Sequence, residues 1–313
     1  MINRDLTHLY PATTIKFMEE AKHLCLLPYS RPQYRVIGHV DNDLPTWCPV
    51  WSFWGEWKDY FDIHNNGDFT ADGRRPYNGS RQGNTILKLE GILLDTLEVV
   101  GPLIPDMNVP PGDFVPIMQE WLNLAESRDL GPEVIWECMH VATHVEVGLD
   151  KVDLQAAYWE DLKRLASEDA SIQDMKAAVI EGDHQFCFES GAWLDKRSFF
   201  ATKPSESFPE VTSEEGPAHG ISGYRSKMPK GSVGMALPNV RAGDVVFIIK
   251  GGRTPLLFRP LSGERLLERA LEEGVPENKL SRCYTLVGVS YIHGLMQGQG
   301  VTDSSSWEDV YLL

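Results

Sequence analysis

The segment "ECMHVATH" brings together side chains that could move protons. Glu137, His140 and His144 are spaced by three and four residues, so on a helix they share one face. A carboxylate and two imidazoles on one face can act as general acid or base or bind a polar ligand. A metal site has weaker support, because there is no H-E-x-x-H pattern and no identifiable third ligand. We predict His140 and His144 as catalytic residues and no metal site; ordinary helix surface is the alternative.

A second pair of polar side chains occurs in "SYIHG" near the C-terminus. Tyr291 and His293 alternate along an expected strand, so their side chains lie on the same face. If that face points inward, a phenol and an imidazole enter one cavity; if it points outward, both are surface residues. We add Tyr291 and His293 to the predicted catalytic residues, with a purely structural role as the alternative.

Aromatic side chains are concentrated in "DNDLPTWCPVWSFWGEWKDYF", which spans residues 41–61. Indole rings offer flat, polarisable surface that can stack on a polyene or stabilise developing positive charge. The alternative is a core plug between helices and sheet, and for Trp47 and Trp51 we expect this structural role first. We predict a ligand-binding set of aromatic residues: Trp54, Trp57, Trp51 and Trp136.

Composition narrows the class of protein. The chain has 313 residues, is 42% hydrophobic and carries a formal net charge of −16. It can therefore bury a large core, whereas its charge opposes binding to nucleic acid and to anionic membranes. No apolar run approaches the roughly 20 residues of a membrane span, and the N-terminus has no secretory signal. Five scattered cysteines without a C-x-x-C pair indicate a reducing, cytoplasmic location.

The expected elements divide the chain into two parts. Residues 1–182 are mainly helical, with a helix over Thr13–Leu27, several helices between about residues 111 and 181, and a short β element. That β element, over Ile86–Val100, is either two short strands that turn near Glu90-Gly91 or one bent strand.

Residues 183–313 form a mainly β part. Its features are a strand in "KRSFFATK", a long polar loop over 204–231, a hairpin that turns at Gly251-Gly252, a helix over 263–274 and a strand in "CYTLVGVSYIHG". The predicted fold class is α+β, with a helical middle packed on a small C-terminal antiparallel β-sheet or barrel and the Trp segment near their junction.

Four motifs in the same order resemble the C-terminal region of fungal heterokaryon-incompatibility (HET-domain) proteins. They are "LPTWCPVWS", "LKLEGILLDTLEVVG", "RAGDVVFIIKGGRTPLLFRPL" and "YTLVGVSYIHGLMQGQ". The family pattern differs in several places: Val50 stands where an aspartate is usual, Gln297 or Gln299 replaces an acid, and residues 262–281 are inserted. The HET domain, which is linked to triggering cell death, is absent, and Met1 falls where that domain would end.

The resemblance without the effector domain implies a repurposed, free-standing module. We expect a cofactor-independent enzyme of fungal specialised metabolism that binds a small apolar molecule and promotes its cyclisation or isomerisation, in the manner of a pericyclase or cyclase. No P-loop, G-x-G-x-x-G or G-x-S-x-G motif supports a nucleotide cofactor or a serine nucleophile. The alternatives are a recognition or regulatory module that acts through protein partners, and a relic without activity.

Overall fold

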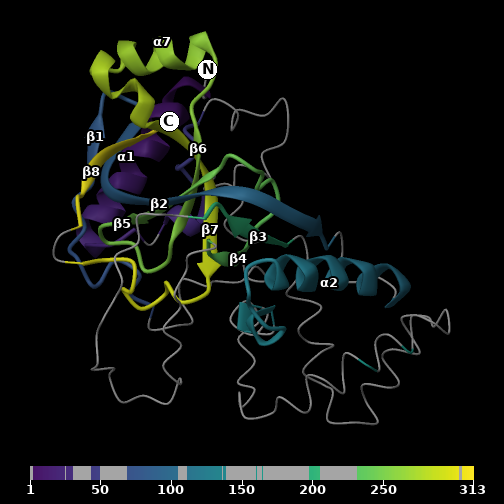
Figure 1. The fold of residues 1–313 in the computed structure, drawn as a ribbon. Coiled ribbons are helices and arrows are strands. Elements are labelled where there is room, and N and C mark those ends of the chain that lie inside the picture. The colour runs from purple at the N-terminus through teal and green to yellow at the C-terminus, as the bar shows by residue number, and fades with distance from the viewer. Residues whose placement is uncertain are drawn as a thin grey trace.

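The computed structural model shows helices packed on an eight-stranded, largely antiparallel sheet, so the predicted α+β class is confirmed (Figure 1). It describes residues 3–24, 26–30, 44–49, 69–104, 111–135, 137–138, 160, 164, 197–204, 231–302 and 305–313. The predicted helical middle lies mostly outside the described residues, so its packing on the sheet stays a prediction.

Eight strands build the sheet. They are β1 (Ser80–Gln82), β2 (Ile86–Leu103), β3 (Ser198–Thr202), β4 (Val233–Ala236), β5 (Val245–Ile249), β6 (Leu256–Pro260), β7 (Cys283–Ile292) and β8 (Glu308–Leu312). The order along the sheet is β1-β2-β3-β4-β7-β6-β5, and β5 pairs again with β2. Six strands therefore close into a ring. All pairings are antiparallel except that of β7 with β8, which is parallel.

Strand β2 supports one of the two interpretations of Ile86–Val100, a single bent strand, over two short strands. It runs without a turn at Glu90-Gly91 for 18 residues and pairs with β1, β3, β5 and β8. Register shifts near Leu93/Asp95 and Leu97/Val99 mark irregularities, and such bulges let a strand bend around a closed sheet. The sheet is thus not confined to the C-terminal part, because its longest strand precedes residue 182.

Both faces of β3, β4 and β5 are buried, which explains why these strands lack polar alternation. In β5, Val246 and Ile248 face the cluster that fills the ring, whereas Val245, Phe247 and Ile249 belong to a cluster shared with the N-terminal helix. In β3 and β4 the outward residues belong instead to a third cluster, which includes side chains of α2. Apolar side chains on both faces of these three strands therefore pack in a buried hydrophobic cluster.

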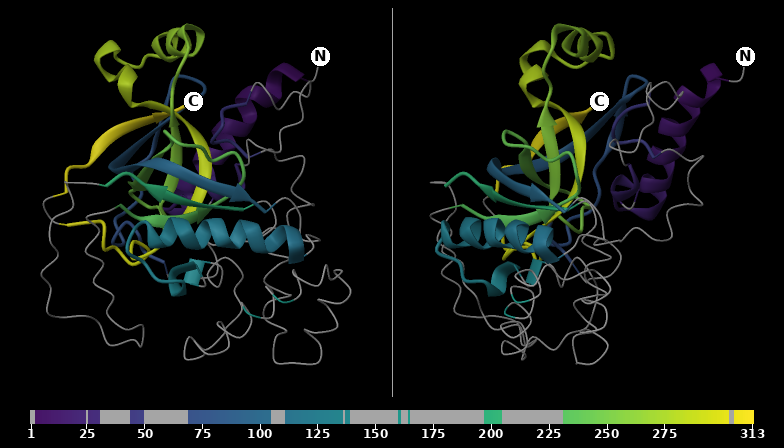
Figure 2. Two further views of the ribbon diagram at one scale, coloured as in Figure 1. Left: turned by 45° about the vertical axis from the view of Figure 1, so that its right-hand side comes forward. Right: turned by 90° about the vertical axis from the view of Figure 1, so that its right-hand side faces the viewer.

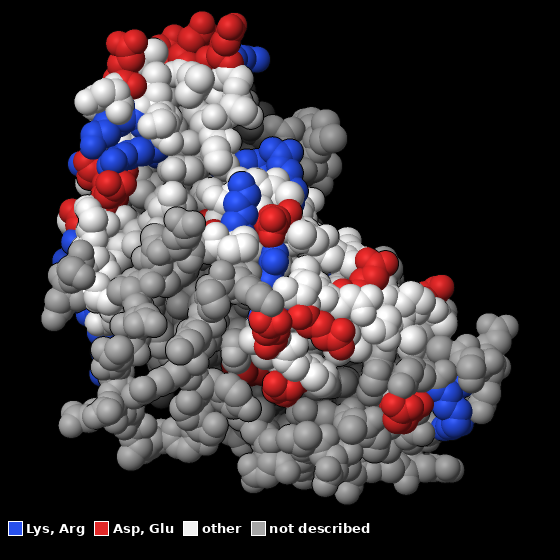
Figure 3. Space-filling model, in the orientation of Figure 1, with Lys and Arg blue, Asp and Glu red and all other residues white. Residues whose placement is uncertain are grey.

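The helices occupy different parts of the outside of this ring (Figure 2). They are α1 (Asn3–Ala21), α2 (Pro111–Glu126) and α7 (Glu264–Glu272), with 3-10 turns η1 (Leu27–Tyr29) and η5 (Glu277–Arg282). α1 packs over β5, β6 and β8, and α2 lies along β2 and β3. α7 stands at one end, where acidic side chains gather on the surface (Figure 3). Among the described helices, none has the length and apolar composition needed to cross a bilayer.

The N-terminal helix also differs from expectation. It begins ten residues earlier than predicted and ends at Ala21, where Lys22 takes a positive φ of 60°. Thr14 therefore lies inside the helix, where its hydroxyl donates to the Tyr10 carbonyl oxygen at 2.8 Å. Four predictions in the C-terminal part are confirmed: the hairpin of β5 and β6, the strand β3, the strand β7 and the helix α7. The predicted polar loop over 204–231 lies almost entirely outside the described residues.

Candidate functional site

The structure places only some of the predicted site residues. Tyr291 and His293 are described, and both are buried. The others lie outside the described residues: His140, His144, Trp51, Trp54, Trp57 and Trp136. The buried Trp47 is a structural anchor, as expected, since its indole N–H donates to the Thr85 carbonyl oxygen at 3.1 Å.

A single carboxylate joins the two polar segments found in the sequence. The Tyr291 hydroxyl donates to Oε1 of Glu137. The Nδ1 atom of His293 lies 2.9 Å from Oε2 of the same carboxylate, at ion-pair distance but without hydrogen-bond geometry. These three residues, Glu137, Tyr291 and His293, are here called the Glu137 cluster. Glu137 lies 154 positions before Tyr291 in the sequence, so only the fold brings the cluster together.

Local structure explains how the carboxylate arrives there. A helical stretch that includes residues 133–135 and 137–138 follows Gly131 and Pro132, close to the predicted helix start. Val134, Ile135 and Cys138 are buried against the α2 side of the sheet. Their burial holds Glu137 at the end of β7. On the strand side, Met235 pairs with Tyr291, and the His293 N–H donates to the Val233 carbonyl oxygen at 3.0 Å.

Burial controls the chemistry of the cluster. Desolvation, followed by the negative charge of Glu137, raises the pKa of Tyr291 well above its ordinary value. The phenol therefore stays protonated at neutral pH and serves as a hydrogen-bond donor. The neighbouring Cys138 thiol is also buried, which raises its pKa, so it is an inert core side chain. Of the three cluster members, Glu137 alone has a substantial exposed fraction, 32% of its side chain.

The arrangement suits a carboxylate that exchanges protons with a molecule on its exposed side. On its buried side the Glu137 carboxylate accepts a hydrogen bond from the Tyr291 phenol and lies beside the His293 imidazole. The Phe69 ring lies 6.4 Å from the Tyr291 ring and contributes an apolar neighbour. Sequence spacing had grouped Glu137 with His140 and His144, and no pattern in the sequence pairs it with β7. The pairing depends on the tertiary fold alone.

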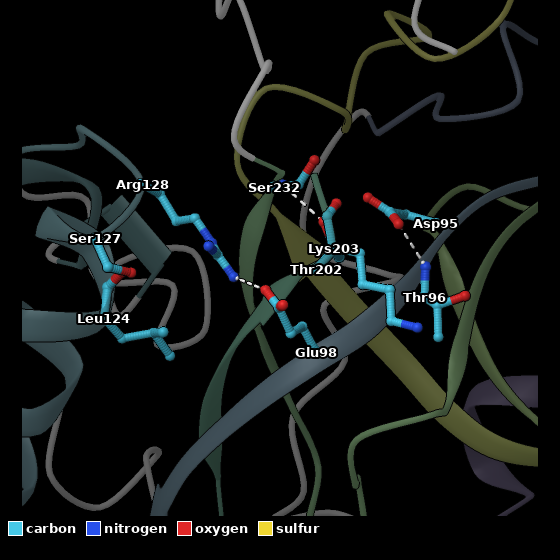
Figure 4. Close-up of polar contacts among 9 residues, drawn as sticks. All are labelled: Asp95, Thr96, Glu98, Leu124, Ser127, Arg128, Thr202, Lys203 and Ser232. Atoms are coloured by element: carbon cyan, nitrogen blue, oxygen red, sulfur yellow. Dashed lines mark hydrogen bonds and ion pairs between the residues drawn. The ribbon is translucent and has the colours of Figure 1, made fainter. Parts of the chain in front are cut away.

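A second polar group connects α2 to the sheet (Figure 4). The Arg128 guanidinium, just after α2, pairs with Glu98 on β2. Nearby, Oδ1 of Asp95 accepts the Thr96 N–H at 2.6 Å, and the Thr202 hydroxyl accepts the Ser232 N–H at 2.7 Å. The Arg128–Glu98 pair joins the chain just after α2 to β2, and the Ser232–Thr202 contact joins β3 to the segment before β4, so we read these contacts as structural.

No metal centre is evident in the parts of the chain that the structure describes, where no three His, Cys, Asp or Glu side chains are grouped to hold an ion. Cys48, Cys138 and Cys283 are free and buried. Comparison with protein-family models, curated proteins and solved structures gave no match.

Proposed function

We propose that this chain is a cofactor-independent enzyme of cyclase or isomerase type, in which Glu137 transfers a proton to or from a small apolar substrate. The observation that carries the proposal is the partly exposed Glu137 carboxylate, which is held between the buried Tyr291 phenol and the His293 imidazole. In this assignment Glu137 is the catalytic residue, and Tyr291 and His293 are positioning residues.

The physical basis is preorganisation. A carboxylate that is held in place by fixed donors does not have to reorganise solvent during proton transfer. The protonated phenol of Tyr291 is such a donor, and the His293 imidazole lies at ion-pair distance from the other carboxylate oxygen. The resemblance to the region that follows the HET domain suggests fungal specialised metabolism as the setting. We propose that the aromatic segment of this chain, with Trp54 and Trp57, contacts the apolar part of the substrate, such as a polyene.

Proton abstraction is testable without the natural substrate. The neutral, planar probe 5-nitrobenzisoxazole opens to a coloured phenolate when a base removes its carbon-bound proton, so absorbance reports general-base activity. We expect the full chain to catalyse this opening above the rate in buffer. Glu137→Gln should lower the rate by about tenfold or more, since general-base catalysis contributes 10²–10⁴-fold in evolved sites. Tyr291→Phe should have a smaller effect.

A matched control is Glu98→Gln, which removes another partly exposed carboxylate that has an ion-pair partner. It should leave the rate unchanged. Binding of the neutral polyene 1,6-diphenylhexatriene, whose emission rises in apolar surroundings, tests the apolar site separately. If Glu137→Gln and Glu98→Gln have equal rates, or if the polyene does not bind, the enzyme assignment is overturned. The recognition module acting through protein contacts then becomes the better account.

A further inference from the structure

A pocket that shares no lining residue with the Glu137 cluster combines cationic, aromatic and hydroxyl side chains. Its volume is about 490 Å³, within the usual range for small-molecule sites. Its lining residues are Arg75, Pro76, Tyr77, Asn78, Lys250, Thr302, Ser305 and Trp307. They come from the segment before β1, the turn between β5 and β6, and the segment before β8, so only the folded chain assembles the pocket.

Backbone contacts hold these segments in register. The Asp72 carboxylate accepts the Arg74 N–H at 3.0 Å and the Gly251 N–H at 2.9 Å. Gly251 has a φ of +80°, and a Cβ there would lie 2.8 Å from the Tyr77 Cα. The position therefore requires glycine for both its conformation and its close approach. On the other side, the Thr302 N–H donates to the Ser305 hydroxyl at 2.8 Å.

Glu90 on β2 orients two of the lining side chains. It pairs with the Lys250 ammonium, and it accepts a hydrogen bond from the Asn78 amide at 2.6 Å. The Lys250 ammonium also lies 5.1 Å from the centre of the Trp307 ring, in a cation–π contact. The Lys250 ammonium and the Trp307 ring thus line one side of the pocket together.

The charge of the lining is opposite to that of the molecule. Arg75 and Lys250 are cationic, and none of the lining residues is acidic, although the chain has a formal net charge of −16. Two aromatic rings, Tyr77 and Trp307, provide flat apolar surface, and hydroxyl and amide groups provide hydrogen-bond donors. These features recognise an anionic group attached to a flat body.

We propose that this pocket binds a small organic anion with a planar apolar body, such as an aromatic carboxylate or an aryl phosphate. The cations neutralise the anionic group, the rings pack against the planar body, and Thr302, Ser305 and Asn78 donate hydrogen bonds. The proposal is independent of the enzyme assignment, because none of the lining residues belongs to the Glu137 cluster.

The test uses two probes that differ only by one anionic sulfonate group. Both 8-anilinonaphthalene-1-sulfonate and its neutral counterpart N-phenyl-1-naphthylamine become fluorescent when they leave water. With the full chain, we expect saturable binding of the sulfonate at one site and at least about tenfold weaker binding of the neutral probe, equivalent to about 1.4 kcal/mol. Added salt should weaken sulfonate binding, because it screens the cations.

Variants locate the site. Lys250→Met and Arg75→Gln should each weaken sulfonate binding about five- to tenfold, and Lys250→Arg should retain it. The matched control is Lys88→Met, which removes a lysine that pairs with Asp309 at 3.0 Å elsewhere on the sheet and should have no effect. Glu137→Gln should also bind normally, which separates this site from the enzyme assignment. Thermal melting of each variant verifies that it is folded; if Lys250→Met unfolds, Arg75→Gln decides.

Competition then identifies the anionic group. Displacement of the sulfonate probe by 1-naphthoate indicates a carboxylate ligand, and displacement by 1-naphthyl phosphate indicates a phosphate ligand. The proposal is overturned if the neutral probe binds as tightly as the sulfonate, if the folded Lys250→Met and Arg75→Gln variants bind the sulfonate as tightly as wild type and Lys88→Met do, or if neither competitor displaces the probe.

Discussion

Individual carboxylates in this protein differ in how completely their burial is compensated. Burial raises the pKa of both Asp72 and Asp95. Asp72 accepts the Arg74 and Gly251 N–H groups, whereas Oδ2 of Asp95 is buried without a hydrogen-bond partner. Burial raises the pKa of Asp95, and the hydrogen bond from the Thr96 N–H offsets only part of that effect. The ionised form of Asp95 is therefore less favourable in the folded chain than in the unfolded chain.

The pH dependence of stability should report this imbalance. A carboxyl group with a raised folded-state pKa binds its proton more tightly when folded, so its stabilising contribution is full below the unfolded pKa, about 3.9. That contribution is lost as pH rises through the folded pKa. Relative to Asp95→Asn, wild type should thus gain unfolding free energy as pH falls from 7 toward 4, as measured by urea unfolding at each pH.

The control for this experiment is Glu268→Gln, which removes an exposed acid on α7. Its unfolding free energy should change with pH in the same way as that of wild type over the same range. A constant difference between wild type and Asp95→Asn at all pH values would contradict the account of Asp95.

Among the elements, the connection between β4 and β5 depends on one ion pair. The fully buried Asp244 carboxylate accepts hydrogen bonds from the Arg259 Nε at 2.7 Å and Nη2 at 2.9 Å, and from the Arg241 N–H at 2.9 Å. Arg259, on β6, also donates to the Asn239 carbonyl oxygen at 2.6 Å. The bidentate pair therefore fastens the loop before β5 to the neighbouring strand.

Removal of this carboxylate should be costly. Asp244→Ala leaves the Arg259 guanidinium, which is 25% exposed, without its partner, and we expect a loss of about 3 kcal/mol of unfolding free energy. The matched control is Asp309→Ala, which breaks the partly exposed pair with Lys88 and should cost less than about 1 kcal/mol. Urea unfolding midpoints compare the two. Equal losses would show that burial does not govern the Asp244 pair.

For the whole molecule, closure of the ring is the main organising feature. β2 lies in the first part of the chain, yet β3, β5 and β8, its partners, lie in the second. Its residues also contribute to the core inside the ring and to the core under α1. The two sequence parts therefore share one sheet and one interior.

Separated parts should not fold by themselves. Without β2, residues 183–313 would leave the backbone N–H and C=O groups of β3 and β5 unpaired at open edges, and the ring interior would be exposed. We expect neither 1–182 nor 183–313 alone to show a cooperative thermal transition by circular dichroism, whereas the full chain should show one. A cooperative transition in 183–313 alone would indicate that it is an independent domain.

Much of the C-terminal architecture was predictable from sequence because its signals are local. The glycine pair at Gly251-Gly252 between apolar runs predicts the hairpin, and the 3.6-residue pattern of "GERLLERALEEG" predicts α7. The sequence does not predict β1, β4 or β8: β1 and β4 have only three and four residues and carry little periodic signal, and β8 begins with the acidic Glu308 and Asp309 in place of an apolar run. For Ile86–Val100 the sequence left two short strands and one bent strand open, because Gly91 resembles a turn; in the structure it lies opposite Ile249 within one continuous strand.

The candidate sites show the limit of sequence reasoning most clearly. By itself the sequence determined the residue types, the shared face of Tyr291 and His293, and an acidic, apolar-rich chain of α+β class. Only the tertiary structure decided that Glu137 reaches those two residues, and that Arg75, Lys250 and Trp307 line one pocket. The physical reason is that spacing along the chain reports neighbours on one helix or strand, whereas contacts between distant segments follow from sheet closure and the packing of buried faces.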